Sequence, residues 1–340
     1  MSSEQTSLSA AHALLQGLVD YAGLFPPARL SMADAARNYA TYLRSPESWM
    51  LGRFICPVSR LEEFRAATAG LLPTAGSTNG SAAAHSPHAE SPWPISAIID
   101  GDLDENLDAI FAFNAEHIQP SKGLAVIDAA EIRVPADKPP AAFIDESLDL
   151  IPEAVFPFFE IAIMPEKGAP AASPPDLRGP IAALSGADAG AKVRTGGLTP
   201  DAFPAPDRLA EFLLACAAAD VPFKATAGLH HPIRAEHPLT YEPGCPRAVM
   251  HGFINLFFAA ALAHVNRRSS PADPARQTLT RVLLEADPRA FVFSEQALAW
   301  RDILLEGSQI ALARETFALS FGSCSFDEPV ADLKALRIIA

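Results

Sequence analysis

The sequence contains no run of lysine and arginine residues that would form a basic patch. It has 26 Lys and Arg against 40 Asp and Glu, which gives a formal net charge of -14. A chain this acidic repels phosphate backbones and anionic membrane surfaces. We therefore expect no nucleic acid and no membrane as partners, and a small-molecule substrate instead.

Cysteine and long apolar runs are scarce as well. The cysteines have neither the spacing of a metal site nor that of a disulfide framework, which favours a reducing compartment; they are Cys56, Cys216, Cys245 and Cys324. The first residues, MSSEQTSLSAAHALLQ, carry no basic segment followed by an apolar one, so no secretory signal is indicated. The longest apolar run, GFINLFFAAALAHV, is too short to span a bilayer and predicts a buried core helix. These features favour a cytoplasmic protein and leave a homo-oligomer open.

What the sequence does have is an alternation of short β-rich runs and longer helical patterns. Hydrophobic residues make up 49% of it and charged residues 19%, as in a globular protein with a large core. The predicted strands are 18–23, 52–57, 95–100, 123–128, 158–164, 191–197, 222–228 and 317–323. This rhythm predicts an α/β fold, a (β/α)8 TIM barrel formed by residues 1–340 as one domain. A doubly wound open sheet is the alternative, because periodicity does not report closure.

Three segments depart from the rhythm. Residues 71–94 are rich in Ser, Ala, Gly and Pro and predict a flexible surface loop. Residues 165–180 form a second Pro-rich loop. Residues 232–315 are more than one barrel helix requires, so we expect a helical embellishment between strands seven and eight.

Strand alternation predicts charged side chains inside the barrel. Side chains on a strand point alternately to its two faces, and the face toward the helices should be apolar. This places Lys192 and Arg194 of AKVRTGG inside, with Lys224 and Thr226 of PFKATAG and Glu160 of FFEIAIM. A buried charge costs several kcal/mol unless it is paired, so such residues indicate an active site at the carboxyl ends of the strands. The alternative is a structural ion bridge from Glu160 to Lys192 or Arg194. Such a bridge would leave at least one cation unpaired, which favours an anionic substrate or an uncharged lysine.

An uncharged lysine could act as a nucleophile. Free lysine has a pKa of about 10.4, and lowering it by about three units means destabilising the ammonium by roughly 4 kcal/mol. Burial and a neighbouring positive charge can supply this. Lys192 and Lys224 on adjacent strands, with Arg194 beside them, predict such an arrangement.

Three short motifs resemble strands six, seven and eight of the deoxyribose-phosphate aldolase family. That family contains class I, Schiff-base (β/α)8 aldolases. Its strand-six Lys-Thr-Ser-Thr-Gly, strand-seven Lys-Ala-Ser-Gly-Gly and strand-eight Gly-Ser patterns are matched at Lys192, Thr195, Gly196, Lys224, Ala225, Gly228, Gly322 and Ser323, with Thr226 in place of a serine. Ala227 or Leu229 departs from the second glycine of the strand-seven motif.

The resemblance implies a role for each matched residue. Lys192 would form the Schiff base and Lys224 would be the cation that lowers its pKa. Gly228, Gly322 and Ser323 would lie near the anionic end of the substrate. Asp100, at the end of the third predicted strand, is the positional candidate for the family's catalytic aspartate.

Histidines and a further carboxylate follow two of the predicted strands. His230 and His231 come directly after strand seven, where either could bind substrate or act as a general acid or base. Because adjacent side chains point apart, a metal would need Glu160, His237 or His251 as a further ligand. Asp20 of DYAGLFPPAR could add a carboxylate.

These residues predict a lyase, aldolase-like, that needs no cofactor and no metal. Lys192 forms an imine with an oxygenated carbonyl compound, phosphorylated compounds included. Lys224 tunes the imine lysine, Arg194 binds the substrate's anion, and Glu160 or His230 moves protons. One alternative is a divalent-metal TIM-barrel isomerase or hydrolase that uses Glu160 with His230 and His231. The other is a non-catalytic ligand-binding barrel.

Overall fold

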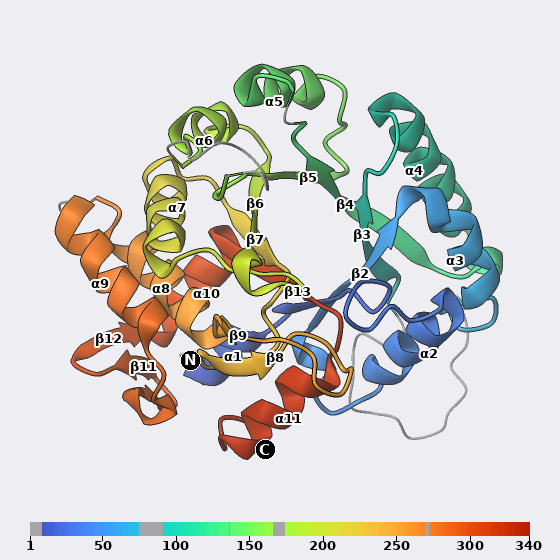
Figure 1. Cartoon of the computed structure of the whole chain (residues 1–340). Coiled ribbons are helices and arrows are strands. Elements are labelled where there is room, and N and C mark those ends of the chain that lie inside the picture. The colour runs from blue at the N-terminus through green and yellow to red at the C-terminus, as the bar shows by residue number, and fades with distance from the viewer. Residues whose placement is uncertain (1–8, 75–90, 136, 166–173, 269–271) are drawn as a thin grey trace, which may run out of the picture.

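Parallel strands close into a barrel in the computed structural model of the chain, which describes residues 9–74, 91–135, 137–165, 174–268 and 272–340 (Figure 1). The strand order around the barrel is β1-β13-β7-β6-β5-β4-β3-β2. The first and last strands pair in parallel, with Asp20 opposite Gly322. The predicted (β/α)8 barrel is therefore confirmed, and the open sheet is wrong.

The barrel strands are β1 Val19–Tyr21, β2 Leu51–Pro57, β3 Trp93–Ile98, β4 Ala125–Arg133, β5 Phe156–Glu160, β6 Gly190–Arg194, β7 Phe223–Thr226 and β13 Ala318–Ser323. The helices are α1 Ala10–Leu15, α2 Met32–Tyr42, α3 Leu61–Thr68, α4 Leu103–His117, α5 Pro140–Leu148, α6 Arg178–Leu184, α7 Pro206–Ala218, α8 Phe253–Asn266, α9 Ala272–Leu284, α10 Gly307–Thr316 and α11 Asp327–Ala335. Helices α2 to α7 follow their strands one by one around the barrel (Figure 1).

Local sequence signals set where several of these helices begin. The Ser31 side chain accepts a hydrogen bond from the backbone of α2, and Asp102 accepts two from the first turn of α4. Such N-caps satisfy backbone N–H groups that have no partner inside the helix. Helices α5 and α7 begin with Pro140 and Pro206, and proline suits the first helical position because no N–H is needed there.

The predicted strands all correspond to barrel strands, although their ends differ, and two of these differences bear on the site. The fourth was predicted to end at residue 128, whereas β4 runs on to Arg133. The fifth was predicted to reach residue 164, whereas β5 ends at Glu160. The longer β4 brings Glu131 and Arg133 to the same barrel end as Glu160.

The segment between β7 and β13 contains more than the predicted helices. Besides α8, α9 and α10 it forms a hairpin, β8 Ala235–Pro238 with β9 Arg247–Met250, and an antiparallel sheet of β10 Phe291–Phe293, β11 Ala297–Trp300 and β12 Ile303–Glu306. The apolar run of the sequence is α8, which is buried from Phe253 to His264 as predicted. Within the residues that the structure describes, no helix has the length and apolar character needed to cross a membrane.

The predicted surface loop 71–94 extends too far at both ends. Leu72 is buried, and the carbonyl of Pro73 accepts a hydrogen bond from Leu124 N at 2.7 Å. Trp93 begins β3 and is 2% exposed. Residues 75–90 of this segment, and 166–173 of the second Pro-rich loop, lie outside the described residues.

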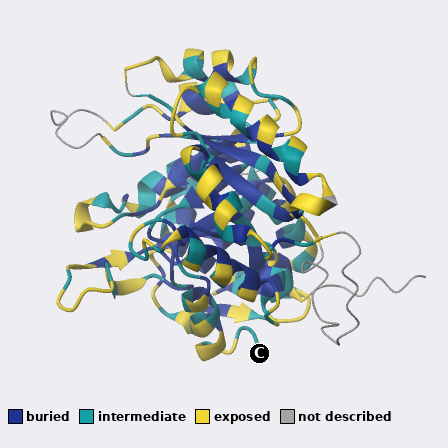
Figure 2. Cartoon of the chain, turned by 90° about the vertical axis from the view of Figure 1, so that its right-hand side faces the viewer, coloured by how far each residue is buried: buried dark blue, intermediate teal, exposed yellow. Residues whose placement is uncertain are grey.

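The core follows the barrel, with buried strands in the middle and exposed residues on the outer helix faces (Figure 2). Arg314 of α10 helps to close the seam between the first and last strands. Its guanidinium donates to the carbonyls of Leu14 and Gln16, before β1, and to those of Ala318 and Leu319 in β13. A partly buried guanidinium has five N–H donors to satisfy, and these carbonyls accept from it.

Candidate active site

A row of charged residues crosses adjacent strands near the carboxyl end of the barrel. In the strand register Arg133 of β4 is opposite Glu160 of β5, which is opposite Lys192 of β6, which is opposite Lys224 of β7. Glu131 precedes Arg133 by two residues and so shares its face of β4. The closed sheet therefore collects these side chains in one place.

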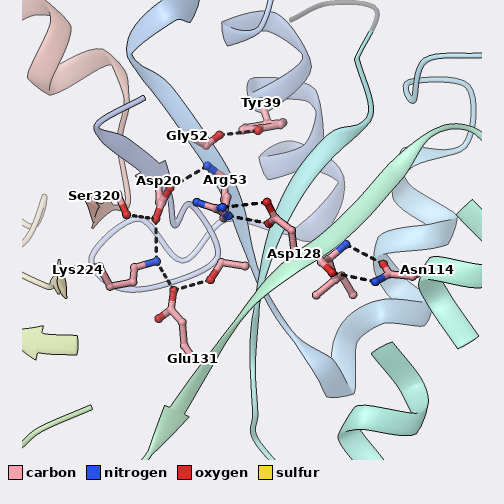
Figure 3. A network of polar contacts seen from close by, with 11 residues as sticks. Asp20, Tyr39, Gly52, Arg53, Asn114, Asp128, Glu131, Lys224 and Ser320 are labelled. Carbon is pink, nitrogen blue, oxygen red and sulfur yellow. Dashed lines mark hydrogen bonds and ion pairs between the residues drawn. The ribbon is translucent and has the colours of Figure 1, made fainter. Parts of the chain in front are cut away.

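Lys224 lies at the deepest point of this group and is fully buried. Its Nζ is 2.7 Å from Asp20 Oδ2 and 2.6 Å from Glu131 Oε1 (Figure 3). The Ser320 hydroxyl donates to the same Asp20 oxygen at 2.7 Å, and Arg53 N donates to Asp20 Oδ1 at 2.8 Å. Asp20 is thus held by partners from β2, β7 and β13, on both sides of the closing seam.

Lys192 continues the network toward the barrel mouth. Its Nζ is 2.8 Å from Glu131 Oε2 and 2.9 Å from Glu160 Oε2. Glu131 therefore bridges the two lysines through its two oxygens, and Ser96 donates to it at 2.9 Å. Arg194 Nη1 lies 3.9 Å from Glu160 Oε1. The charges alternate in sign from Asp20 to Arg194.

This pairing corrects two predictions from the sequence. We expected at least one cation without a partner, but both lysines have carboxylate partners because Glu131 and Asp20 also belong to the site. We also expected a lowered pKa for Lys192. Burial does disfavour its ammonium, but the Glu131 and Glu160 carboxylates outweigh burial and raise the pKa. Burial likewise opposes the charge of Glu131, yet the two lysines hold the pKa of its carboxyl well below the usual range.

A cavity of about 430 Å³ opens above this network at the barrel mouth. The predicted site residues in its lining are Glu160, Lys192, Arg194, Thr226, Gly228, His230 and Gly322. Gly228 has a φ of 72°, and a Cβ there would lie 2.9 Å from Gly196 Cα, so the backbone requires glycine. Lys224 lies beneath the cavity, with Glu131 of the lining between it and the open space.

The two neighbouring histidines have different surroundings. His230 is buried in the wall of the cavity, with Nδ1 3.3 Å from Ser323 Oγ and 3.7 Å from Glu328 Oε2. Burial lowers its pKa to about 4, so the ring is neutral at pH 7. His231 turns away: its Nδ1 is 2.6 Å from Asp332 Oδ2, and its ring stacks on His237.

This arrangement does not bring the predicted metal ligands together. Within the described ranges, no three or more His, Cys, Asp or Glu residues form a group that could hold a metal ion. The His237 ring stacks on His231. His251 Nε2 is hydrogen-bonded to the Pro204 carbonyl at 2.9 Å. Glu160 is engaged by Lys192.

Sequence reasoning missed Glu131 and misjudged Asp100. Asp100 accepts from the Ser59 hydroxyl at 2.5 Å and from Ser59 N at 3.1 Å, so it is tied to the β2–α3 connection. The carboxylate between the lysines is Glu131 instead. The pairing of β4 with β3 shifts between Ile127 and Ala129, so the alternation of residues 123–128 does not continue to Glu131 and gave no signal for it.

No family model, curated protein or solved structure matches this chain. The resemblance to deoxyribose-phosphate aldolases therefore stays a prediction from its three motifs.

Proposed function

We propose that this protein is an aldolase-like lyase that forms an imine between Lys192 and a small oxygenated carbonyl compound. The observation that carries the proposal is the position of Lys192. Its Nζ lies between the carboxylates of Glu131 and Glu160, and all three residues line the same cavity. Acid–base partners within hydrogen-bonding distance are what imine formation needs.

The proposed first step forms the imine. The Lys192 ammonium gives a proton to Glu160, 2.9 Å away. The free amine then adds to the carbonyl carbon, and one of its protons passes to the carbonyl oxygen to give the carbinolamine. The protonated carboxyl then returns the proton to the hydroxyl of the carbinolamine, which leaves as water. An ammonium and a carbonyl thus become a protonated imine and water, and the carboxylate is restored.

The second step breaks a carbon–carbon bond. A base removes the proton of a hydroxyl on the carbon β to the imine, the bond breaks, and its electron pair flows into the protonated imine. The products are a free aldehyde and an enamine on Lys192. Glu160 and the neutral His230 are the bases that line the cavity for this step.

Lys224 serves in this scheme as a positioning residue. It is bound to Asp20 and Glu131 and is separated from the cavity by Glu131. Its charge keeps Glu131 ionised and in place between the two lysines. This role differs from the direct lowering of a lysine pKa that the family resemblance implies.

Borohydride trapping tests the proposal. Reduction of an imine leaves a stable secondary amine, so the wild-type protein treated with a panel of hydroxyaldehydes and borohydride should gain mass on the peptide that contains Lys192. Lys192→Arg keeps the positive charge but removes the nucleophile, and should gain none there. Lys334→Arg, at an exposed lysine on α11, is the matched control and should label as the wild type does.

Absence of labelling at Lys192 with every compound of the panel would contradict the proposal. Activity that is lost to a chelator and restored by a divalent ion would then favour the metal-dependent alternative. Binding without turnover would favour a ligand-binding barrel.

A further inference from the structure

A second, larger cavity adjoins the barrel mouth on the side of β4, β5 and β6. It measures about 780 Å³ and shares Arg133, Glu160, Arg194, Gly197 and Leu198 with the lining of the first cavity. The two cavities are therefore neighbouring parts of one depression. The part of it that holds Lys192 has two arginines at its border with the outer part.

These arginines are available to a ligand. The Arg194 side chain is 55% exposed, and its 3.9 Å distance to Glu160 is too long for a hydrogen bond. The Arg133 side chain has no ion pair or hydrogen bond with any residue that the structure describes. A guanidinium presents a planar fork of donors that matches a carboxylate or phosphate group.

Glu160 and Asp176, two carboxylates of the outer cavity, have closer partners than these arginines. Glu160 is held by Lys192, and Asp176 accepts from the backbone of Arg178 and Gly179 at the start of α6. An incoming anion thus meets Arg133, together with Arg194, whose ion pair with Glu160 is long at 3.9 Å.

The geometry points to a substrate with an anionic end group, a carboxylate or a phosphate, that Arg133 and Arg194 bind while its carbonyl carbon reaches Lys192. This inference rests on the proposed function and names its substrate class. Only the Glu160 carboxylate separates Arg194 from Lys192, so the anion is a few bonds from the carbonyl. The site that the family resemblance implies for the anion, near Gly228 and Gly322, is on other strands.

Matched pairs of aldehydes test the inference. Succinic semialdehyde and butanal have the same chain length but differ in charge, and glyceraldehyde 3-phosphate and glyceraldehyde form a phosphate pair. The measurement is the rate of borohydride-dependent labelling of Lys192 per unit concentration. We expect the wild type to favour the charged member of one pair at least about tenfold, since a charge-assisted contact contributes this much. A preference in the first pair indicates a carboxylate site, and a preference in the second pair indicates a phosphate site.

Arg133→Gln and Arg194→Gln should each reduce this preference by about tenfold. Arg289→Gln, at an exposed arginine of neither cavity, should keep it. Labelling by the neutral aldehydes without a preference for charge, or a preference that survives both substitutions, would overturn the inference while the proposed function stands.

Thermal unfolding tests the anion site without imine formation. If no aldehyde labels Lys192, the proposed function fails, and thermal unfolding with succinate or inorganic phosphate then tests the anion site alone. A rise in melting temperature that is lost in Arg133→Gln and Arg194→Gln supports the site, because a ligand that binds only the folded state stabilises it. No rise with either anion overturns it.

Discussion

At the scale of single residues, the feature that governs this barrel is the alternation of buried charges. Asp20, Lys224, Glu131, Lys192 and Glu160 follow one another with contacts of 2.6 to 2.9 Å. Buried pairs are weak evidence for stability, because apolar residues of the same volume often serve as well. A role in function explains their cost better, and Glu131, Lys192 and Glu160 are the members that line the cavity.

Removing the deepest cation should be more damaging than removing a surface cation. Lys224→Met leaves Asp20 buried without its counter-ion, and we expect a loss of about 3–5 kcal/mol in the free energy of unfolding. Adding Asp20→Asn should return about 1 kcal/mol or more, because the stranded charge is then gone. Urea denaturation measures both.

The matched control is Lys334→Met, at a half-exposed lysine that pairs with Glu47. Exposed pairs contribute about 0–1 kcal/mol, so this variant should remain near the wild type. Equal losses for Lys224→Met and Lys334→Met would mean that the buried network does not stabilise the fold.

Strand alternation was sufficient to predict which lysines face inward, but not which residues partner them. Lys192 and Lys224 lie on short strands whose outward neighbours are apolar, so their orientation could be inferred from a few residues. Asp20 is 204 residues from Lys224 along the chain, and that pairing depends on barrel closure. No local pattern reports a contact of that separation.

At the scale of elements, the ends of strands and loops decide what reaches the site. The prediction ended the fourth strand at residue 128 and so left Glu131 and Arg133 out of the barrel, whereas β4 continues to Arg133. The small sheets in the β7–β13 segment were missed as well, because strands such as β10 and β8 have only 3 and 4 residues. Periodicity needs a longer window than that.

The Ser, Gly, Ala and Pro content of residues 75–90 leads to a prediction about stability. Such a composition buries little apolar surface, so replacing these residues by a short Gly-Ser linker should leave the melting temperature nearly unchanged. Deleting all of 71–94 should instead destabilise the protein strongly, because Leu72 and Trp93 leave the core with it. Thermal unfolding of the two variants separates these results, and a loss of several degrees in the shorter deletion would contradict the first.

At the scale of the whole molecule, buried histidines make the fold sensitive to acid. Burial lowers the pKa of His230 and His251 to about 4. The surroundings of His251 are consistent with this lowered pKa. Its Nε2 is hydrogen-bonded to the Pro204 carbonyl, and its Nδ1 is buried without a hydrogen-bond partner among the described residues. A second proton would have to be placed on that nitrogen.

These histidines predict a loss of stability that begins well above the range of carboxylate titration. In the unfolded chain a histidine has a pKa of about 6.5, so between pH 6.5 and 4 the unfolded state binds more protons than the folded state. The free energy of unfolding should therefore fall as the pH is lowered through this window, by up to about 1.4 kcal/mol per pH unit for each fully buried histidine.

His251→Gln should reduce the slope of the free energy of unfolding against pH by about 1.4 kcal/mol per pH unit, which is the contribution of one proton. The same variant at pH 8 is the control, because histidine is neutral there in both states and the slope should match the wild type. Urea denaturation at several pH values measures it, and an unchanged slope between pH 6.5 and 4 would mean that His251 is protonated in the folded protein.

The closing seam also has a consequence for how the barrel is made. During synthesis Asp20 leaves the ribosome early. Its partners Lys224 and Ser320 lie 204 and 300 residues further along the chain and are made much later. Until β13 has emerged, β1 and β7 both have an open edge, and Asp20 cannot have all its partners. During synthesis most of the sheet is therefore present before its last strand, β13. The charged network around Lys192 becomes complete only after nearly the whole protein has been synthesised.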